Sequence, residues 1–191
     1  MVVGPFVRWI AKAVSVIGHP LVVLPLIFTS LAFRYLPLEK AAIMSAALVG
    51  GVILPIAWRS YRNVQRGHYT NFDVSNQTQR TGFYPVLLLL TGFFTLFLFA
   101  TNQYEPFNRG AICFFLMLAG SYAANFFLKI SLHTSINFFL AVALYTLDVP
   151  LGFLMGVFSV LVALSRLVLE RHSAAEISVG VIFGLLAGAG L

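Results

Sequence analysis

Two histidines in this sequence have neighbours that could make them chemically active. His172 is followed four residues later by Glu176, and residues at that separation share one face of a helix. A carboxylate at this distance can fix the tautomer of an imidazole and stabilise its positive charge, which activates histidine as a nucleophile. His133 could then act as the general acid that protonates a departing oxygen.

Cationic and hydroxyl side chains accompany these histidines. Lys129 lies four residues and Ser131 two residues before His133, and Arg166 lies six residues before His172. Arg80 belongs to a polar stretch earlier in the chain. Guanidinium groups present a fork of donors that matches two oxygens of a phosphate dianion. The sequence contains neither a Cys/His metal set nor an HExxH motif, so we expect a phosphate site without a metal or other cofactor.

The composition requires these groups to lie at the edge of a membrane. The chain has 191 residues, of which 60% are hydrophobic and 9% charged, whereas a soluble domain has about 25% charged residues. Twelve Lys and Arg against six Asp and Glu give a net charge of +6. The low charge content and high hydrophobicity exclude a nucleic-acid-binding domain. The basic residues lie between apolar segments, which favours anionic lipid headgroups or phosphate as partners.

Hydropathy predicts seven apolar spans, each near the length that a bilayer demands. We therefore expect an all-α, polytopic membrane helix bundle with six to seven transmembrane helices, forming one domain over residues 1–191. His19-Pro20 falls inside the first span, where the proline should kink the helix and a ligand role for His19 is the less favoured alternative. The predicted spans are 13–34, 41–60, 84–101, 109–128, 132–148, 150–168 and 174–190.

A polar loop is predicted from Arg59 to Gly82, between the second and third spans. Two crossings separate this loop from Lys129 and His133, and two more separate those residues from His172. An even number of crossings each time predicts that all these groups meet on one face of the bilayer. Most basic residues fall on that face, which the positive-inside rule would make cytoplasmic. Phosphate binding by some of these cations is the competing explanation for their excess. We expect an integral membrane protein of the cell (inner) membrane, with its orientation left open.

The last cluster resembles a known signature. Ser165-Arg166-x5-His172 is similar to the third signature of the type 2 phosphatidic acid phosphatase (PAP2) superfamily, in which Ser-Arg-x5-His is followed by x3-Asp. Glu176 stands where the family has the aspartate. Order and spacing agree over several positions, so this part of the resemblance is fairly specific.

The two other signatures are weaker. Ser131-Leu132-His133 resembles the end of the family's Pro-Ser-Gly-His signature, with leucine in place of glycine. Arg80 resembles the arginine of the Lys-x6-Arg-Pro signature, but Asp73 occupies the lysine position. These departures indicate a divergent member, and they leave a reduced, a narrowed or a lost activity open as alternatives.

The resemblance implies a metal-independent hydrolase, a phosphatase acting on membrane lipid phosphates or polyprenyl pyrophosphates. It implies that His172 forms a phosphohistidine oriented by Glu176, and that His133 is the general acid and later the base. It also implies that Arg80, Ser131 and Arg166 hold the phosphoryl oxygens. Separately from the resemblance, we expect Lys129 to supply the positive charge that is missing because Asp73 stands at the lysine position.

Other interpretations remain for the same residues. The chain could be a phosphotransferase, or a non-catalytic membrane protein that binds anionic lipids. Ser173-x-x-Glu176 is also typical of a capping box at a helix start, and Ser131 could simply cap the next helix. Arg166 and Lys129 could extend to the membrane interface without binding any ligand.

The last span carries glycine at every fourth position, at Gly180, Gly184 and Gly188. Small residues at this spacing let helix backbones approach closely. We expect the glycines to pack inside the bundle, and a homo-oligomer formed through such Gly-x3-Gly faces is the alternative.

Overall fold

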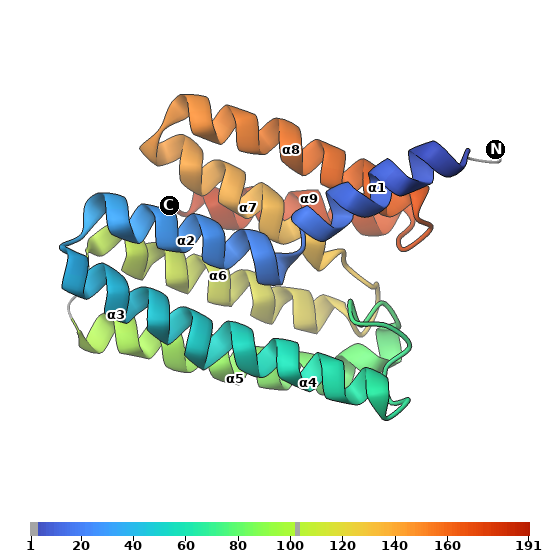
Figure 1. The fold of residues 1–191 in the computed structure, drawn as a ribbon, viewed down its shortest axis with the longest axis horizontal. Coiled ribbons are helices and arrows are strands. Elements are labelled where there is room, and N and C mark those ends of the chain that lie inside the picture. Colours follow the sequence, from blue (N-terminus) through green and yellow to red (C-terminus); the bar gives the residue numbers. More distant parts are fainter. Residues whose placement is uncertain (1–3, 102–103) are drawn as a thin grey trace. The chain divides into compact units, whose positions relative to one another are not determined.

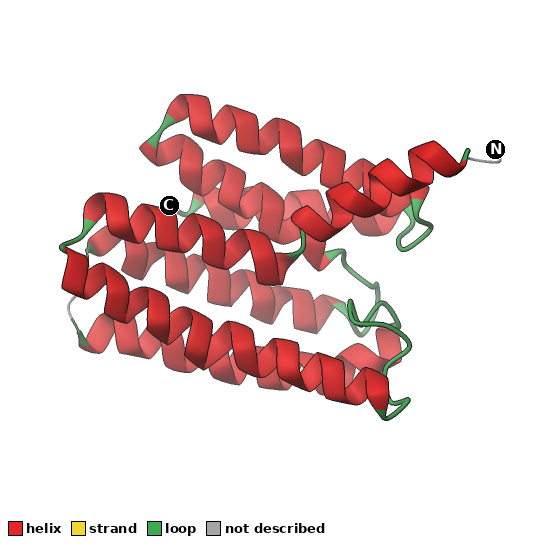
Figure 2. Ribbon diagram, viewed as in Figure 1, coloured by secondary structure: helices red, strands yellow, loops and turns green. Residues whose placement is uncertain are grey.

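The computed structural model describes residues 4–101 and 104–191, and its secondary structure there is entirely helical (Figure 2). The all-α prediction is confirmed. The helices are α1 (Pro5–Ile17), α2 (Pro20–Tyr35), α3 (Leu38–Leu48), the π-helical segment η1 (Val49–Ile53), α4 (Leu54–Gln65), α5 (Gln77–Ala100), α6 (Glu105–Ala124), α7 (Leu132–Leu147), α8 (Val149–Val168) and α9 (Ala174–Ala189).

The chain divides into two compact units, with one boundary at Pro25 inside α2 and the other between Phe127 and Leu128. The first unit joins residues 1–24 to residues 128–191, and the second is the continuous segment 25–127. The first unit therefore contains α1, the start of α2, and α7 to α9. The expectation of one domain stays a prediction.

In the first unit, α7 packs against both α8 and α9, and α1 packs on α8 (Figure 1). Asp148 ends α7 and caps α8, because its Oδ1 accepts a hydrogen bond from the Leu151 N–H at 3.1 Å. Pro150 follows in the first turn of α8, where a missing N–H costs nothing. The short connection makes α7 and α8 antiparallel, so the start of α7 lies beside the end of α8.

The glycines of α9 bring its backbone onto α7. A Cβ atom added to Gly180 would lie 3.0 Å from the Ser131 carbonyl oxygen, and one added to Gly184 would lie 2.5 Å from that of Ser135. The Cβ atom of Val142 would lie 2.5 Å from one added to Gly188. The predicted packing of these glycines inside the bundle is confirmed, and a homo-oligomer stays a prediction.

In the second unit, α3, η1 and α4 form one helical stretch from Leu38 to Gln65. The pair α5 and α6 is tied at one end by Gln77, whose Nε2 donates to the Asn125 carbonyl oxygen at 2.7 Å. Asn125 returns a bond from its Nδ2 to the Gln77 carbonyl oxygen at 3.3 Å. Further along α5, the ring of Tyr84 stacks on that of Tyr122 at 5.3 Å between centroids.

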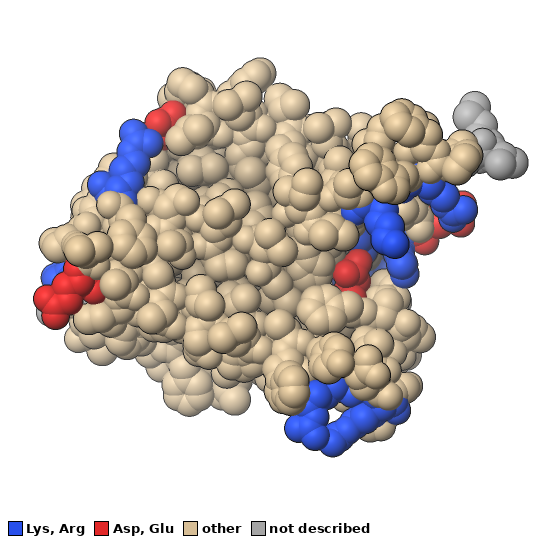
Figure 3. Space-filling view, viewed as in Figure 1, with Lys and Arg blue, Asp and Glu red and all other residues tan. Residues whose placement is uncertain are grey.

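Three helical stretches among the described residues are long and apolar enough to cross a membrane: Leu38–Gln65, Gln77–Ala100 and Val149–Val168. The bent pair α1 and α2 makes a fourth if it counts as one span. α7 and α9 are apolar but have 16 residues each, about 24 Å of helix. Charged side chains gather near helix ends on the face drawn in Figure 3. These features are those of a membrane protein.

Two sequence expectations about helix ends can be compared with the structure. The predicted kink at His19-Pro20 is confirmed as a break, since α1 ends at Ile17 and α2 begins at Pro20. The predicted loop from Arg59 to Gly82 is too long, because α4 continues to Gln65 and α5 starts at Gln77. Hydropathy ends a span where polar residues begin, whereas the polar ends of α4 and α5 remain helical.

Replacing Gly184 by alanine tests the close approach of α9 to α7. The added methyl would overlap backbone and should cost about 1–3 kcal/mol, which lowers Tm in detergent by several degrees. Gly156→Ala is the matched control on α8, because nothing lies within 4 Å of its Cβ position. Alanine should leave Tm unchanged there or raise it slightly. Equal Tm values for the two variants would contradict the packing.

Candidate active site

A hydrogen bond of 2.9 Å joins Nδ1 of His172 to Oε2 of Glu176. The same carboxylate oxygen accepts the Ser173 N–H at 3.1 Å and lies 3.4 Å from Nζ of Lys129. The Ser173 hydroxyl in turn accepts the Glu176 N–H, which completes a capping box at the start of α9. His172 precedes the helix, so the pair meets across the cap instead of along one helical face.

The backbone between α8 and α9 makes a tight reversal that positions His172. Glu170 adopts a φ of 55°, and the N–H groups of Glu170 and Arg171 return to the carbonyl oxygens of Leu167 and Arg166. This is the Schellman pattern, with glutamate where glycine is usual. Lys129 secures the reversal from outside, since its Nζ donates to the Arg171 carbonyl oxygen at 3.2 Å.

Arg166 is buried in the last turn of α8, with 1% of its surface exposed. Its Nη1 donates to Oγ of Ser15 on α1 at 2.6 Å. The alternative in which Arg166 extends to the membrane interface is therefore wrong. Sequence reasoning missed Ser15, which stands in a plain apolar helix and gives no motif.

His133 lies in the first turn of α7 and is 5% exposed. Ser131 is the N-cap of that helix: its Oγ accepts the Thr134 N–H at 3.4 Å and the Thr134 hydroxyl at 3.0 Å. The Ser131 N–H reaches the Glu176 carbonyl oxygen at 3.4 Å. Ser131 thus has the capping role that the sequence allowed, and it brings the starts of α7 and α9 together.

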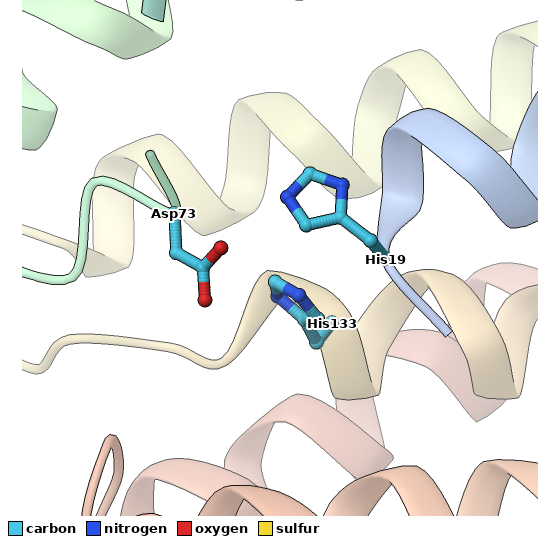
Figure 4. Close-up of side chains that lie close together, drawn as sticks. All are labelled: His19, Asp73 and His133. Atoms are coloured by element: carbon cyan, nitrogen blue, oxygen red, sulfur yellow. The ribbon is translucent and has the colours of Figure 1, made fainter. Parts of the chain in front are cut away.

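His19 is a second residue that sequence reasoning left aside. Its ring meets that of His133 edge to face, with centroids 4.8 Å apart and planes 87° apart (Figure 4). Nδ1 of His19 accepts the Leu21 N–H at 3.1 Å. The only signal in the sequence was the His-Pro pair, which indicates a helix break and does not indicate what the ring contacts.

Asn137 fixes the break beside His133. It is fully buried, and its Nδ2 donates to the carbonyl oxygens of Gly18 at 2.8 Å and of His133 at 2.7 Å. Gly18 packs so tightly on α8 that an added Cβ would lie 2.3 Å from Cγ2 of Val162. The position of His19 is therefore set from α7 and from α8.

The first unit thus gathers six of the seven predicted site residues at one end. This end contains the starts of α7 and α9, and helix N-termini attract anions. Two cationic side chains accompany them, so the end suits a phosphate dianion. The six residues are Lys129, Ser131, His133, Arg166, His172 and Glu176.

Arg80, the seventh, belongs to the second unit. It is 3% exposed, and its Nε donates to the Val74 carbonyl oxygen at 2.8 Å. Val74 is itself buried and has a φ of 47°, a conformation that costs a β-branched residue free energy. Arg80 therefore holds a strained turn of the loop before α5, and its phosphate-binding role stays a prediction.

No family model matches the chain, and neither a curated protein nor a solved structure shows a significant match.

Truncating Asn137 to alanine tests whether this side chain holds the helix break. The Gly18 carbonyl loses a buried donor, which should cost about 1–3 kcal/mol and lower Tm in detergent by several degrees. Ser159→Ala is the control, because Ser159 is equally buried but bonds only the Met155 carbonyl of its own helix. If Asn137→Ala lowers Tm no more than the control does, the hydrogen bond from Asn137 to the Gly18 carbonyl does not hold the helix break.

Proposed function

We propose that this chain is a metal-independent phosphatase of membrane lipid phosphates or pyrophosphates, a divergent member of the type 2 phosphatidic acid phosphatase superfamily. We further propose a multi-pass protein of the cell membrane with six to seven spans. The observation that carries the proposal is the 2.9 Å bond between His172 and Glu176, at the same end of the unit as His133 and Arg166.

The first chemical step uses His172 as the nucleophile. Glu176 engages Nδ1, so Nε2 is the atom that attacks phosphorus. The new P–N bond forms as the P–O bond to the lipid breaks, and the departing oxygen keeps the electron pair. His133 gives a proton to that oxygen. Glu176 stabilises the positive charge of the phosphorylated imidazole.

The second step releases phosphate. A water molecule attacks phosphorus and gives one proton to His133, which restores the protonation state that the first step consumed. The P–N bond breaks, and its electron pair returns to Nε2 of His172. The products are the dephosphorylated lipid, inorganic phosphate and the unchanged enzyme.

Binding of the phosphoryl group falls to fixed donors. Ser131 accepts two bonds from Thr134, and its own hydroxyl proton takes no part in them, so it can donate to a phosphoryl oxygen. Arg166 brings a guanidinium held by Ser15, and Lys129 brings an ammonium held by Glu176. Prepositioned charges in a nearly dry site act strongly on a developing anion. Every group in these steps belongs to the first unit.

Turnover by protein purified in detergent, with a chelator present, tests the proposal. The wild type should release phosphate from dioctanoyl phosphatidate or farnesyl pyrophosphate. His172→Ala should abolish turnover, and His133→Ala should lower kcat about 10²–10⁴-fold because the general acid is lost. His68→Ala is the matched control, since His68 is an exposed loop residue of the second unit.

Turnover that survives in His172→Ala would contradict the mechanism. Vesicle binding without turnover of either substrate would favour the alternative of a non-catalytic protein that binds anionic lipids.

A further inference from the structure

The ring of His19 enters none of the steps above, although it touches that of His133. We propose that His19 is a further catalytic residue, which donates a hydrogen bond to the oxygen that leaves phosphorus. This inference rests on the proposed function and deepens it. It assigns to His19 a role in the departure of the lipid alcohol, which makes the enzyme specific for substrates with an alkoxide leaving group.

The hydrogen bond from the Leu21 N–H determines which ring nitrogen of His19 carries the proton. Nδ1 accepts the Leu21 N–H at 3.1 Å, so the neutral ring carries its proton on Nε2. Nε2 is therefore a hydrogen-bond donor and does not present the lone pair that a metal ion or an attacked phosphorus requires. The chemistry open to this ring is donation to an oxygen atom.

The spacing of the two rings suits one shared oxygen. A ring nitrogen of His19 and one of His133 lie within 4.8 Å of one another. Two hydrogen bonds of about 2.9 Å each span a larger distance than this, so one oxygen atom can bond both nitrogens. The two rings meet edge to face instead of stacking, so the nitrogens of one ring point in different directions from those of the other (Figure 4).

The two histidines then divide the work on the leaving oxygen. As the P–O bond breaks, His133 transfers its proton to that oxygen. His19 keeps its own proton and donates only a hydrogen bond, which stabilises the negative charge before the transfer is complete. This hydrogen bond from His19 should speed the departure of a lipid alkoxide, which is a poor leaving group. It should have little effect on a nitrophenolate, because that anion leaves without a proton.

The neighbouring helices hold His19 in position. Asn137 bonds both the Gly18 and the His133 carbonyls, so the backbone beside one ring is tied to that of the other. Gly18 is fixed against Val162 of α8. A donor that is held by several elements needs little reorganisation when charge develops.

His19 also has a structural role that the test must separate. Its Nδ1 caps the Leu21 N–H at the start of α2, as an asparagine side chain can do. His19→Asn therefore keeps the cap, but its side chain is too short to place a donor at the Nε2 position. His19→Ala removes both the cap and the donor.

The experiment compares kcat of the full-length protein in detergent on dioctanoyl phosphatidate and on p-nitrophenyl phosphate. His19→Asn should keep the wild-type Tm and lose about 10²-fold on the phosphatidate, but less than about tenfold on the aryl phosphate. His19→Ala should show the same contrast together with a lower Tm.

Equal losses of kcat on both substrates, or no loss on either, would overturn the role of His19 and leave the proposed function intact. A wild type that hydrolyses neither substrate would end the proposed function, and the inference with it.

Discussion

Buried polar and ionisable groups in an apolar bundle must find partners, and this constraint governs the first unit. An unpaired charge inside hydrocarbon costs several kcal/mol, so each such group has to be bonded by the protein. Nη1 of Arg166 donates a hydrogen bond to Ser15 of α1, and one oxygen of Glu176 receives contacts from His172, Ser173 and Lys129. Satisfying these groups draws the ends of four helices together.

The backbone supports this convergence at two places. Glycine at Gly180 and Gly184 lets α9 lie against the first turns of α7, so the carbonyl of Glu176 can reach the Ser131 N–H. The Schellman turn at Glu170 then returns the chain from α8 to α9 within a few residues, at the cost of a left-handed glutamate. Residues that bear strain are concentrated where side chains must be placed accurately.

The sequence predicted what depends on local pattern. Composition predicted the helical class, the proline ring predicted the break before Pro20, and short-range spacing predicted the capping box at Ser173. All three features are found in the structure. The roles of Ser15 and Asn137 were not predicted, because Ser15 bonds Arg166 and Asn137 bonds Gly18, and each of these partners lies more than a hundred residues away in the sequence. Arg166 was ambiguous for the same reason: hydropathy locates a span end but does not reveal whether a neighbouring helix covers the side chain.

The central claim is that Nε2 of His172 becomes covalently phosphorylated. Quenching the wild type in base after brief reaction with a lipid phosphate, followed by mass spectrometry of its peptides, tests this most directly, because phosphohistidine survives alkaline conditions. The account predicts a phosphoryl group on His172 that appears with substrate and is absent from His172→Ala. Turnover with no phosphorylated histidine, or with the phosphoryl group on another residue, would contradict it.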